Sequence, residues 1–209
     1  VLDHPANTPP RSADTAAALW RDGLVLVYRL LFILKLESAA DPARAFSFAA
    51  TRLWRESLSP NQALGPLVRR NLDHGHDTGT LLEDGLRLLF RCCRDGLSAG
   101  EIAIAPLGGA LFGPDTMPFL ERLRWGDRAT AHLLDRLLWT TPRSRPRERV
   151  HYGALDVEDL GSIYESLLDL EPGIAETPMA RIRRGRQEIV TQADPVPQAD
   201  AMPHAGEII

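Results

Sequence analysis

The sequence predicts a mainly α-helical protein, an irregular multi-helix domain with at most one or two very short strands. Two observations predict this class. Apolar residues recur at three- and four-residue spacing in several segments, and helix-capping residues or Pro and Gly bound those segments. The 44% hydrophobic content of the 209 residues is enough for one domain with a sizeable core. No internal repeat is present.

The expected organisation is one domain between two tails. Residues 1–12 are Pro-rich with little apolar material and predict an N-terminal tail. Residues 13–173 predict the helical domain. Residues 174–209 are dominated by Pro, Ala, Gln and acidic residues, which predicts a disordered tail or an interdomain linker. Within it, residues 181–190 (RIRRGRQEIV) have the composition of a short basic helix.

The first helix is predicted over residues 15–39, capped by Ser12 or Asp14 and ended by Asp41-Pro42. Apolar side chains cover nearly all of its faces between residues 24 and 36, so it should lie at the centre of the fold. This run is too short to span a bilayer, and Arg29 and Lys35 interrupt it. We therefore expect a buried core helix and no membrane partner.

Four further helices are predicted before residue 140. They cover residues 43–57, residues 61 or 66 to 72, residues 80–97 and residues 127–139. Residues 74–79 (HGHDTG) predict a loop. Residues 100–118 are rich in Gly and Pro and predict an irregular connection with a short strand near residues 102–105.

The most ordered pattern of the chain is at residues 151–172 (HYGALDVEDLGSIYESLLDLEP). Asp156 is a suitable N-cap, with Asp159 three residues further on. Apolar residues then follow at helical spacing, namely Leu160, Ile163, Tyr164, Leu167 and Leu168. Pro172-Gly173 ends the helix. Residues 151–171 carry six acidic residues and no Lys or Arg, a net charge of -6. The acidic charge indicates that this helix faces protein.

Positive charge gathers just before this segment. The net charge of the chain is -4, which gives no global indication of nucleic-acid binding. Residues 143–149 (RSRPRER), however, carry four Arg and one Glu, a net charge of +3. Arg143, Arg145, Arg147 and Arg149 are the best candidates for DNA-backbone contacts, because a guanidinium binds phosphate through two hydrogen bonds. A solvated Arg-rich loop is the other interpretation.

Motifs for nucleotide, metal and hydrolytic chemistry are missing from the sequence. It has no phosphate-binding G-x-x-x-x-G-K-[ST] loop, no G-x-S-x-G and no H-E-x-x-H. The glycines of residues 105–113 lack the strand, helix and acidic residue of a dinucleotide site. HGHD at residues 74–77 offers too few ligands for a structural zinc. We therefore assign no catalytic, cofactor-binding or metal-binding residue.

The two cysteines and the start of the chain bear on localisation. Cys92 and Cys93 are adjacent, which favours free thiols in a reducing compartment. No signal peptide is visible. Of the 24 basic residues only Lys35 is Lys, a bias typical of GC-rich bacterial coding sequences. We expect a cytoplasmic bacterial protein.

Three stretches together resemble one family. They are residues 26–38 (LVYRLLFILKLES), residues 105–112 (APLGGALF) and the 151–172 segment. They are similar to the helical region that precedes the catalytic domain in large adenine-specific (N6) DNA methyltransferases of type II restriction-modification and phage-defence systems. The similarity covers about residues 15–175, in the family's order and spacing. Its most specific part is the 151–172 segment, which looks like a Tyr-x-x-Leu…Leu-Gly-x-Ile-Tyr-Glu-x-Leu-Leu signature.

The resemblance implies that catalysis belongs to a separate domain. In the family this segment precedes a methyltransferase domain that binds S-adenosylmethionine, opens with a Gly-Ser-Tyr-Tyr-Thr-Pro element and methylates adenine with an Asn/Asp-Pro-Pro-Tyr/Phe loop. None of these elements occurs here. The resemblance therefore implies a helical spacer that contacts DNA backbone and packs on that domain, without enzymatic activity or cofactor of its own. The packing residues would be Tyr152, Leu160, Gly161, Ile163, Tyr164 and Glu165. A stand-alone helical protein-protein interaction module without a nucleic-acid role is the alternative.

Overall fold

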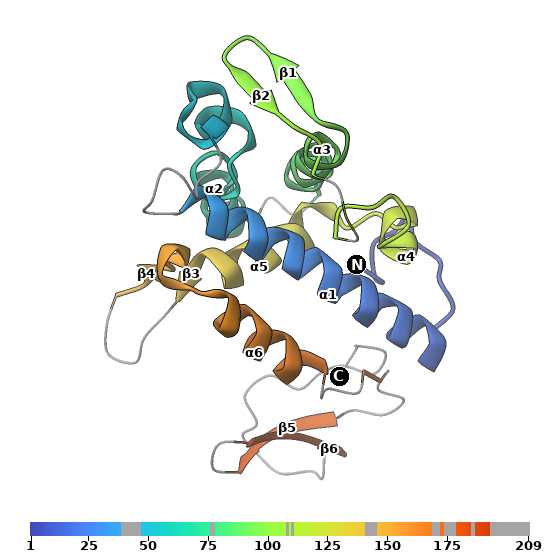
Figure 1. Ribbon diagram of the computed structural model, residues 1–209. Coiled ribbons are helices and arrows are strands. Elements are labelled where there is room, and N and C mark those ends of the chain that lie inside the picture. The colour runs from blue at the N-terminus through green and yellow to red at the C-terminus, as the bar shows by residue number, and fades with distance from the viewer. Residues whose placement is uncertain are drawn as a thin grey trace.

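The computed structural model describes residues 1–38, 47–75, 78–107, 109, 111–140, 146–168, 172–173, 179–184 and 187–192. It is mainly helical, as predicted. Figure 1 shows α1 (Ala13–Glu37) running across the middle of the molecule, with α2 (Gly65–His74) and α3 (Leu81–Asp95) on one side of it and α6 (Val157–Leu168) on the other. The remaining helices are α4 (Pro118–Arg122) and α5 (Gly126–Leu138).

Helix α1 is the centre of the hydrophobic core, as its apolar faces predicted. Ser12 is its N-cap, and the Ser12 Oγ accepts a hydrogen bond from the Thr15 amide at 3.2 Å. Leu30, Ile33 and Leu34 are fully buried. Among the described residues, no helix is both long and apolar enough to cross a membrane.

Helical turns of unusual geometry replace most of the helix predicted at residues 43–57. Residues 39–46 are outside the described part of the chain. A 3-10 turn covers Ser47–Ala50, and π-helical turns cover Trp54–Leu58 and Pro60–Leu64. The break comes at Ser59, whose Oγ caps the second π-turn by accepting from the Gln62 amide at 2.9 Å. Pro60 cannot donate to the preceding turn and disfavours a helical Ser59, whose ψ of 121° is extended, so the helical turns are interrupted here.

Helices α3 and α5 begin side by side, and each supplies the cap of the other. Asp127, in the first turn of α5, accepts from the Leu82 amide at 2.7 Å. Glu83, in the first turn of α3, accepts from the Trp125 and Gly126 amides at 3.0 and 2.8 Å. Both carboxylates are buried. This reciprocal arrangement satisfies amide donors that a helix start leaves without an intrahelical partner.

Among the described residues, six short strands form three antiparallel pairs, more than the one or two strands expected. The strand predicted near residues 102–105 is β2 (Ile102–Ile104), and it pairs with β1 (Leu97–Ala99). The sequence pattern extended the preceding helix to residue 97. The helix instead ends at Asp95, because Gly96 has a φ of 84°, outside the helical region.

The C-terminal part differs from the predicted basic helix. Residues 179–184 and 187–192 form the antiparallel hairpin β5 (Met179–Arg184) and β6 (Gln187–Gln192), and Ile182 is paired with Ile189. Ile182, Ile189, Val190 and Thr191 are β-branched, a residue type that favours strands. The predicted disorder of residues 174–178 and 193–209 concerns residues outside the described ranges.

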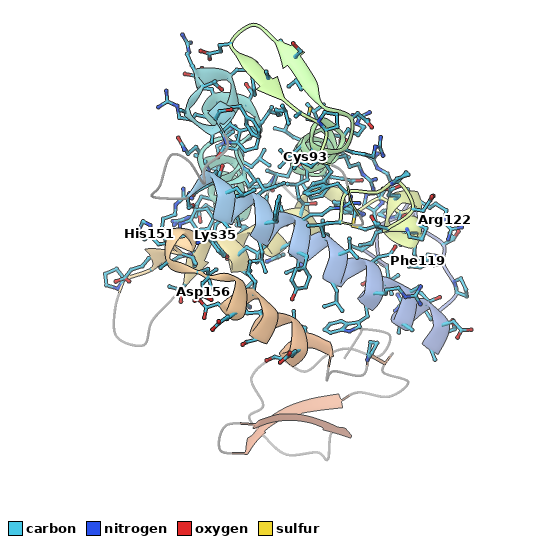
Figure 2. The ribbon with its side chains drawn as sticks, viewed as in Figure 1. Lys35, Cys93, Phe119, Arg122, His151 and Asp156 are labelled. Atoms are coloured by element: carbon cyan, nitrogen blue, oxygen red, sulfur yellow. The ribbon has the colours of Figure 1, made fainter. Side chains whose placement is uncertain are left out.

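The two cysteines are free, as predicted, and both are buried. Burial raises the pKa of the Cys93 thiol to about 12. Figure 2 shows Cys93 inside the molecule, on α3. A thiol in this environment stays protonated at neutral pH and is a poor nucleophile.

Candidate functional site

The predicted Arg loop connects α5 to the segment that leads into α6. It begins after β3 (Trp139–Thr140) and closes at β4 (Glu148–Arg149), and the two strands are antiparallel with Trp139 opposite Arg149. Residues 141–145, and with them Arg143 and Arg145, lie outside the described residues. Arg147 and Arg149 are described, and both contact other side chains of the chain.

Arg147 forms an ion pair with Asp135 on α5, and its guanidinium carbon lies 5.0 Å from the centre of the Trp139 ring. The Arg149 guanidinium lies 4.3 Å from the same ring centre and donates to the Asn61 carbonyl at 3.1 Å. Burial, and then the nearby Arg69, lower the pKa of Arg149. These two arginines therefore hold the strand pair against α5 and the Pro60–Leu64 turn, which the sequence pattern did not indicate.

The turn Tyr152–Ala154 joins this strand pair to α6 and is fixed to the core. Tyr152 is buried, its hydroxyl donates to the Leu137 carbonyl at 2.6 Å, and burial raises its pKa to about 12. Lys35 donates to the Gly153 carbonyl at 2.8 Å. A Cβ at Gly153 would lie 2.5 Å from the Ser38 carbonyl oxygen, so only glycine fits this position.

Helix α6 starts as the sequence predicted. The Asp156 carboxylate accepts from the Asp159 amide at 2.8 Å, and the Asp159 carboxylate accepts from the Asp156 amide at 3.0 Å. This is a capping box built from two aspartates. Figure 2 shows Asp156 at the start of α6, near the end of α1 that carries Lys35. The Tyr28 hydroxyl donates to the Leu160 carbonyl at 3.3 Å and joins α6 to α1.

The faces of α6 differ in what they contact. Leu160 and Ile163 are half-buried and pack against the core of this chain. Gly161 and Glu165 are exposed, and a Cβ at Gly161 would meet no atom within 4 Å. The Tyr164 side chain is not described. Of the predicted packing residues, Tyr152, Leu160 and Ile163 thus contact this chain itself, whereas Gly161 and Glu165 face outward.

An apolar groove of about 550 Å³ runs between α1 and α6. Its lining is mostly aliphatic, with His151, Tyr152 and Asp159 as the polar members; the apolar members are Val27, Leu31, Leu137, Val150, Ala154, Leu155 and Ile163. Leu31 and Tyr152 are buried, while Leu155 and Ile163 are only half-buried. The groove therefore leaves an apolar strip open beside the exposed face of α6.

The three stretches at residues 26–38, 105–112 and 151–172 meet on α1. Arg29 of the first stretch donates from Nε to the Leu111 carbonyl of the second at 2.8 Å. The Phe32 and Phe112 rings are 5.9 Å apart in an edge-on arrangement. Tyr28 and Lys35 donate hydrogen bonds to the Leu160 and Gly153 carbonyls of the third stretch. Segments separated by more than 80 residues in the sequence thus form one contiguous unit.

The described part of the chain contains no cluster of three or more His, Cys, Asp or Glu side chains that could hold a metal ion. In the HGHD stretch, His74 ends α2 and Gly75 stops it with a φ of 64°, while His76 and Asp77 are not described. Comparison with protein-family models, curated proteins and solved structures gives no match for this chain.

Proposed function

We propose that this chain is a helical docking module of an adenine-specific DNA methyltransferase or restriction-modification protein. In this proposal α6 and the groove beside it receive the catalytic domain. That domain would bind S-adenosylmethionine and carry out the methyl transfer, and this chain would have no activity alone. The observation that carries the proposal is the outward face of α6 around Gly161, which no part of the described chain covers.

Three features support a protein partner at this surface. The groove is apolar and open, as a site for a partner's side chains should be. Gly161 leaves space for a second backbone to approach α6 closely. The exposed residues Glu158 and Glu165 make the rim acidic, which disfavours DNA on this face and favours a partner with a basic rim.

A glycine substitution tests the docking surface. The partner would be a methyltransferase domain encoded next to this chain, and its affinity for the chain would be measured by calorimetry. Gly161→Gln should weaken binding about tenfold or more, because the side chain fills the space that the partner occupies. Both Gly161 and Gly23 are helical glycines with open space around the Cβ position, so Gly23→Gln is the matched control.

Each substitution should leave the fold intact, since Gln is a better helix former than Gly by several tenths of a kcal/mol. Equal binding by the Gly161→Gln and Gly23→Gln variants would contradict docking through α6. Failure of the adjacent methyltransferase domain to bind the unchanged chain would favour the stand-alone interaction module instead.

The DNA-backbone part of the proposal concerns Arg143 and Arg145. Arg147 and Arg149 are poor test positions, because their removal also breaks contacts with Asp135 and Asn61. For the complex with duplex DNA, the logarithm of the binding constant should fall linearly with the logarithm of salt concentration. Arg143→Ala with Arg145→Ala should reduce the slope by about 2, at roughly 0.9 per phosphate contact.

The control for this salt titration is Arg52→Ala with Arg55→Ala, which removes the same charge from an exposed surface elsewhere. This control should leave the slope unchanged. An unchanged slope in the Arg143 and Arg145 variant would show that the loop is only a solvated charged segment.

A further inference from the structure

A second hollow, distant in sequence from α6, is lined mainly by arginine and aromatic side chains. Its volume is about 370 Å³. Three of its arginines lie on one face of α3 at spacings of four and three residues, namely Arg87, Arg91 and Arg94. Arg29 enters from α1, and the rings of Phe90, Phe112 and Trp125 complete most of the lining.

Arg29 is an unusual member of this lining because it is almost completely buried, with 3% of its surface exposed. Nε donates to the Leu111 carbonyl at 2.8 Å, and Nη2 donates to the Gly113 carbonyl at 3.1 Å and to the Thr116 hydroxyl. Nη1 has no hydrogen-bond partner in the described part of the chain, and no carboxylate there forms an ion pair with Arg29. Burial lowers the pKa of Arg29, and the nearby carboxylates of Glu121 and Asp22 oppose that shift.

The other arginines differ in the ion pairs and hydrogen bonds that they form within the protein. Arg87 pairs with the buried Glu83 at 2.9 Å, and Arg94 pairs with the exposed Asp95 at 2.8 Å. Arg91 is exposed and makes no hydrogen bond or ion pair with the described residues. Free donors therefore remain on Arg91 and on Nη1 of Arg29.

Negative charge in the lining is smaller than positive charge. The two carboxylates of the hollow are Asp84 and Glu121, against four arginines, so the lining carries a net charge of +2. Asp84 is already engaged, since it accepts from the Thr80 hydroxyl at 2.8 Å and lies 3.5 Å from Arg124. Glu83 and Asp95, which lie outside the lining, offset the charges of Arg87 and Arg94. An anion that enters would therefore accept hydrogen bonds from Arg91 and from Nη1 of the buried Arg29.

We propose that this hollow is a phosphate-binding site formed by Arg29 and Arg91, with Arg94 at its edge. Guanidinium groups bind phosphate oxygens through paired, charge-assisted hydrogen bonds. The volume is in the range of small-ligand pockets, so a mononucleotide fits as well as one phosphate of a DNA strand. Phosphate is the chemistry that both sources share. This site does not depend on docking at α6, which lies elsewhere on the chain.

Binding would be measured with the full chain by calorimetry at low salt, using three probes. These are adenosine monophosphate, adenosine, and a short single-stranded DNA oligonucleotide without a terminal phosphate. Adenosine should not bind, because it lacks the phosphate that the arginines recognise. Binding of the nucleotide alone identifies a free nucleotide as the source, and binding of the oligonucleotide alone identifies the strand backbone; either result supports the site.

Arg91→Gln with Arg94→Gln should weaken the binding of the active probe about tenfold or more, the change expected from losing one charge-assisted hydrogen bond. The matched control is Arg52→Gln with Arg55→Gln. In each pair, one arginine has no side-chain hydrogen bond or ion pair among the described residues. The other forms an exposed ion pair, Arg94 with Asp95 and Arg52 with Glu56. Thermal unfolding of both variants verifies that the fold is retained.

Three results would overturn the phosphate site. They are the absence of binding by both the nucleotide and the oligonucleotide, equal binding of adenosine and its monophosphate, and an equal loss of affinity in the control variant. None of them bears on the docking proposal, whose measurement uses a protein partner and substitutions on α6.

Discussion

Replacing Glu83 with alanine is expected to lower the free energy of unfolding by about 3–5 kcal/mol, the usual cost of removing one partner of a buried ion pair. The side chain of Glu83 is fully buried. One oxygen accepts from the Arg87 guanidinium at 2.9 Å, and the other accepts from the Trp125 and Gly126 amides. Alanine would leave the Arg87 charge without this partner and both amides without an acceptor.

Because small domains are stable by only about 5–15 kcal/mol, this loss is a large part of the total. Urea unfolding followed by circular dichroism measures it. Asp84→Ala is the control, since Asp84 is the next residue, is exposed and makes surface contacts worth about 1 kcal/mol or less. Equal losses for the two variants would contradict the capping role of Glu83.

A double variant separates the ion pair from the caps. Glu83→Ala with Arg87→Ala should cost less than the sum of the two single substitutions, because the second removes the charge that the first leaves unpaired. The part of the loss that remains comes from the Trp125 and Gly126 amides, which begin α5, and from the hydrogen bonds of Arg87 to the Leu120 and Leu123 carbonyls. Strict additivity would show that Glu83 acts through these amides alone.

Trp54→Ala is expected to cause the second large loss, about 3–5 kcal/mol, as for other large-to-small changes of buried aromatic residues. Trp54 is fully buried. Its ring lies 4.9 Å from that of Phe48, and its Nε1 donates to the Glu37 carboxylate at 3.1 Å. The neighbouring Leu53 is exposed, so Leu53→Ala should change the unfolding free energy by about 0.5 kcal/mol or less.

The variant Trp54→Phe retains most of the ring and removes the donor to Glu37, so it gives the contribution of the hydrogen bond. Burial raises the pKa of Glu37, and the hydrogen bonds from Ser59 and Trp54 oppose that shift. Because the pKa of Glu37 is raised in the folded state, its contribution to the free energy of unfolding is fully present at pH values below its ordinary pKa. That contribution is lost as pH rises through the pKa of the folded state. Without the Trp54 donor the folded pKa of Glu37 rises further.

The destabilisation by Trp54→Phe should therefore be small at low pH and grow as pH increases above the ordinary carboxyl range. Urea unfolding of the variant and the unchanged protein at several pH values measures this difference. A difference that is constant with pH would mean that Trp54 contributes through packing alone.

The sequence pattern predicted the structure correctly where that structure depends on residues close together in the chain. Ser12 caps α1, and Asp156 and Asp159 form the cap of α6, because each acts on amides within three residues. The apolar faces between residues 24 and 36 identified the central helix, since burial of all faces leaves no polar side. The pattern failed at residues 181–190, where composition indicated a helix and the described residues form a strand pair.

Tertiary contacts decided the candidate sites. Arg147 and Arg149 were predicted as phosphate contacts, but they also bind Asp135 and Asn61, and Asn61 is 88 residues from Arg149 in the sequence. The grouping of Gly161 and Glu165 on the outer face of α6, and of Leu160 and Ile163 on the inner face, depends on where α1 lies.

By itself, the sequence determined that this protein is mainly helical, where α1 and α6 begin, and which segment is most acidic. These properties depend on periodicity, capping and composition, which act over one or two helical turns. Only the tertiary structure decided that Glu83 and Asp127 cap each other's helices, and that Arg29 is buried beside the arginines of α3. The physical reason is that hydrogen bonds and burial join residues far apart in the chain, and no local pattern encodes which of them meet.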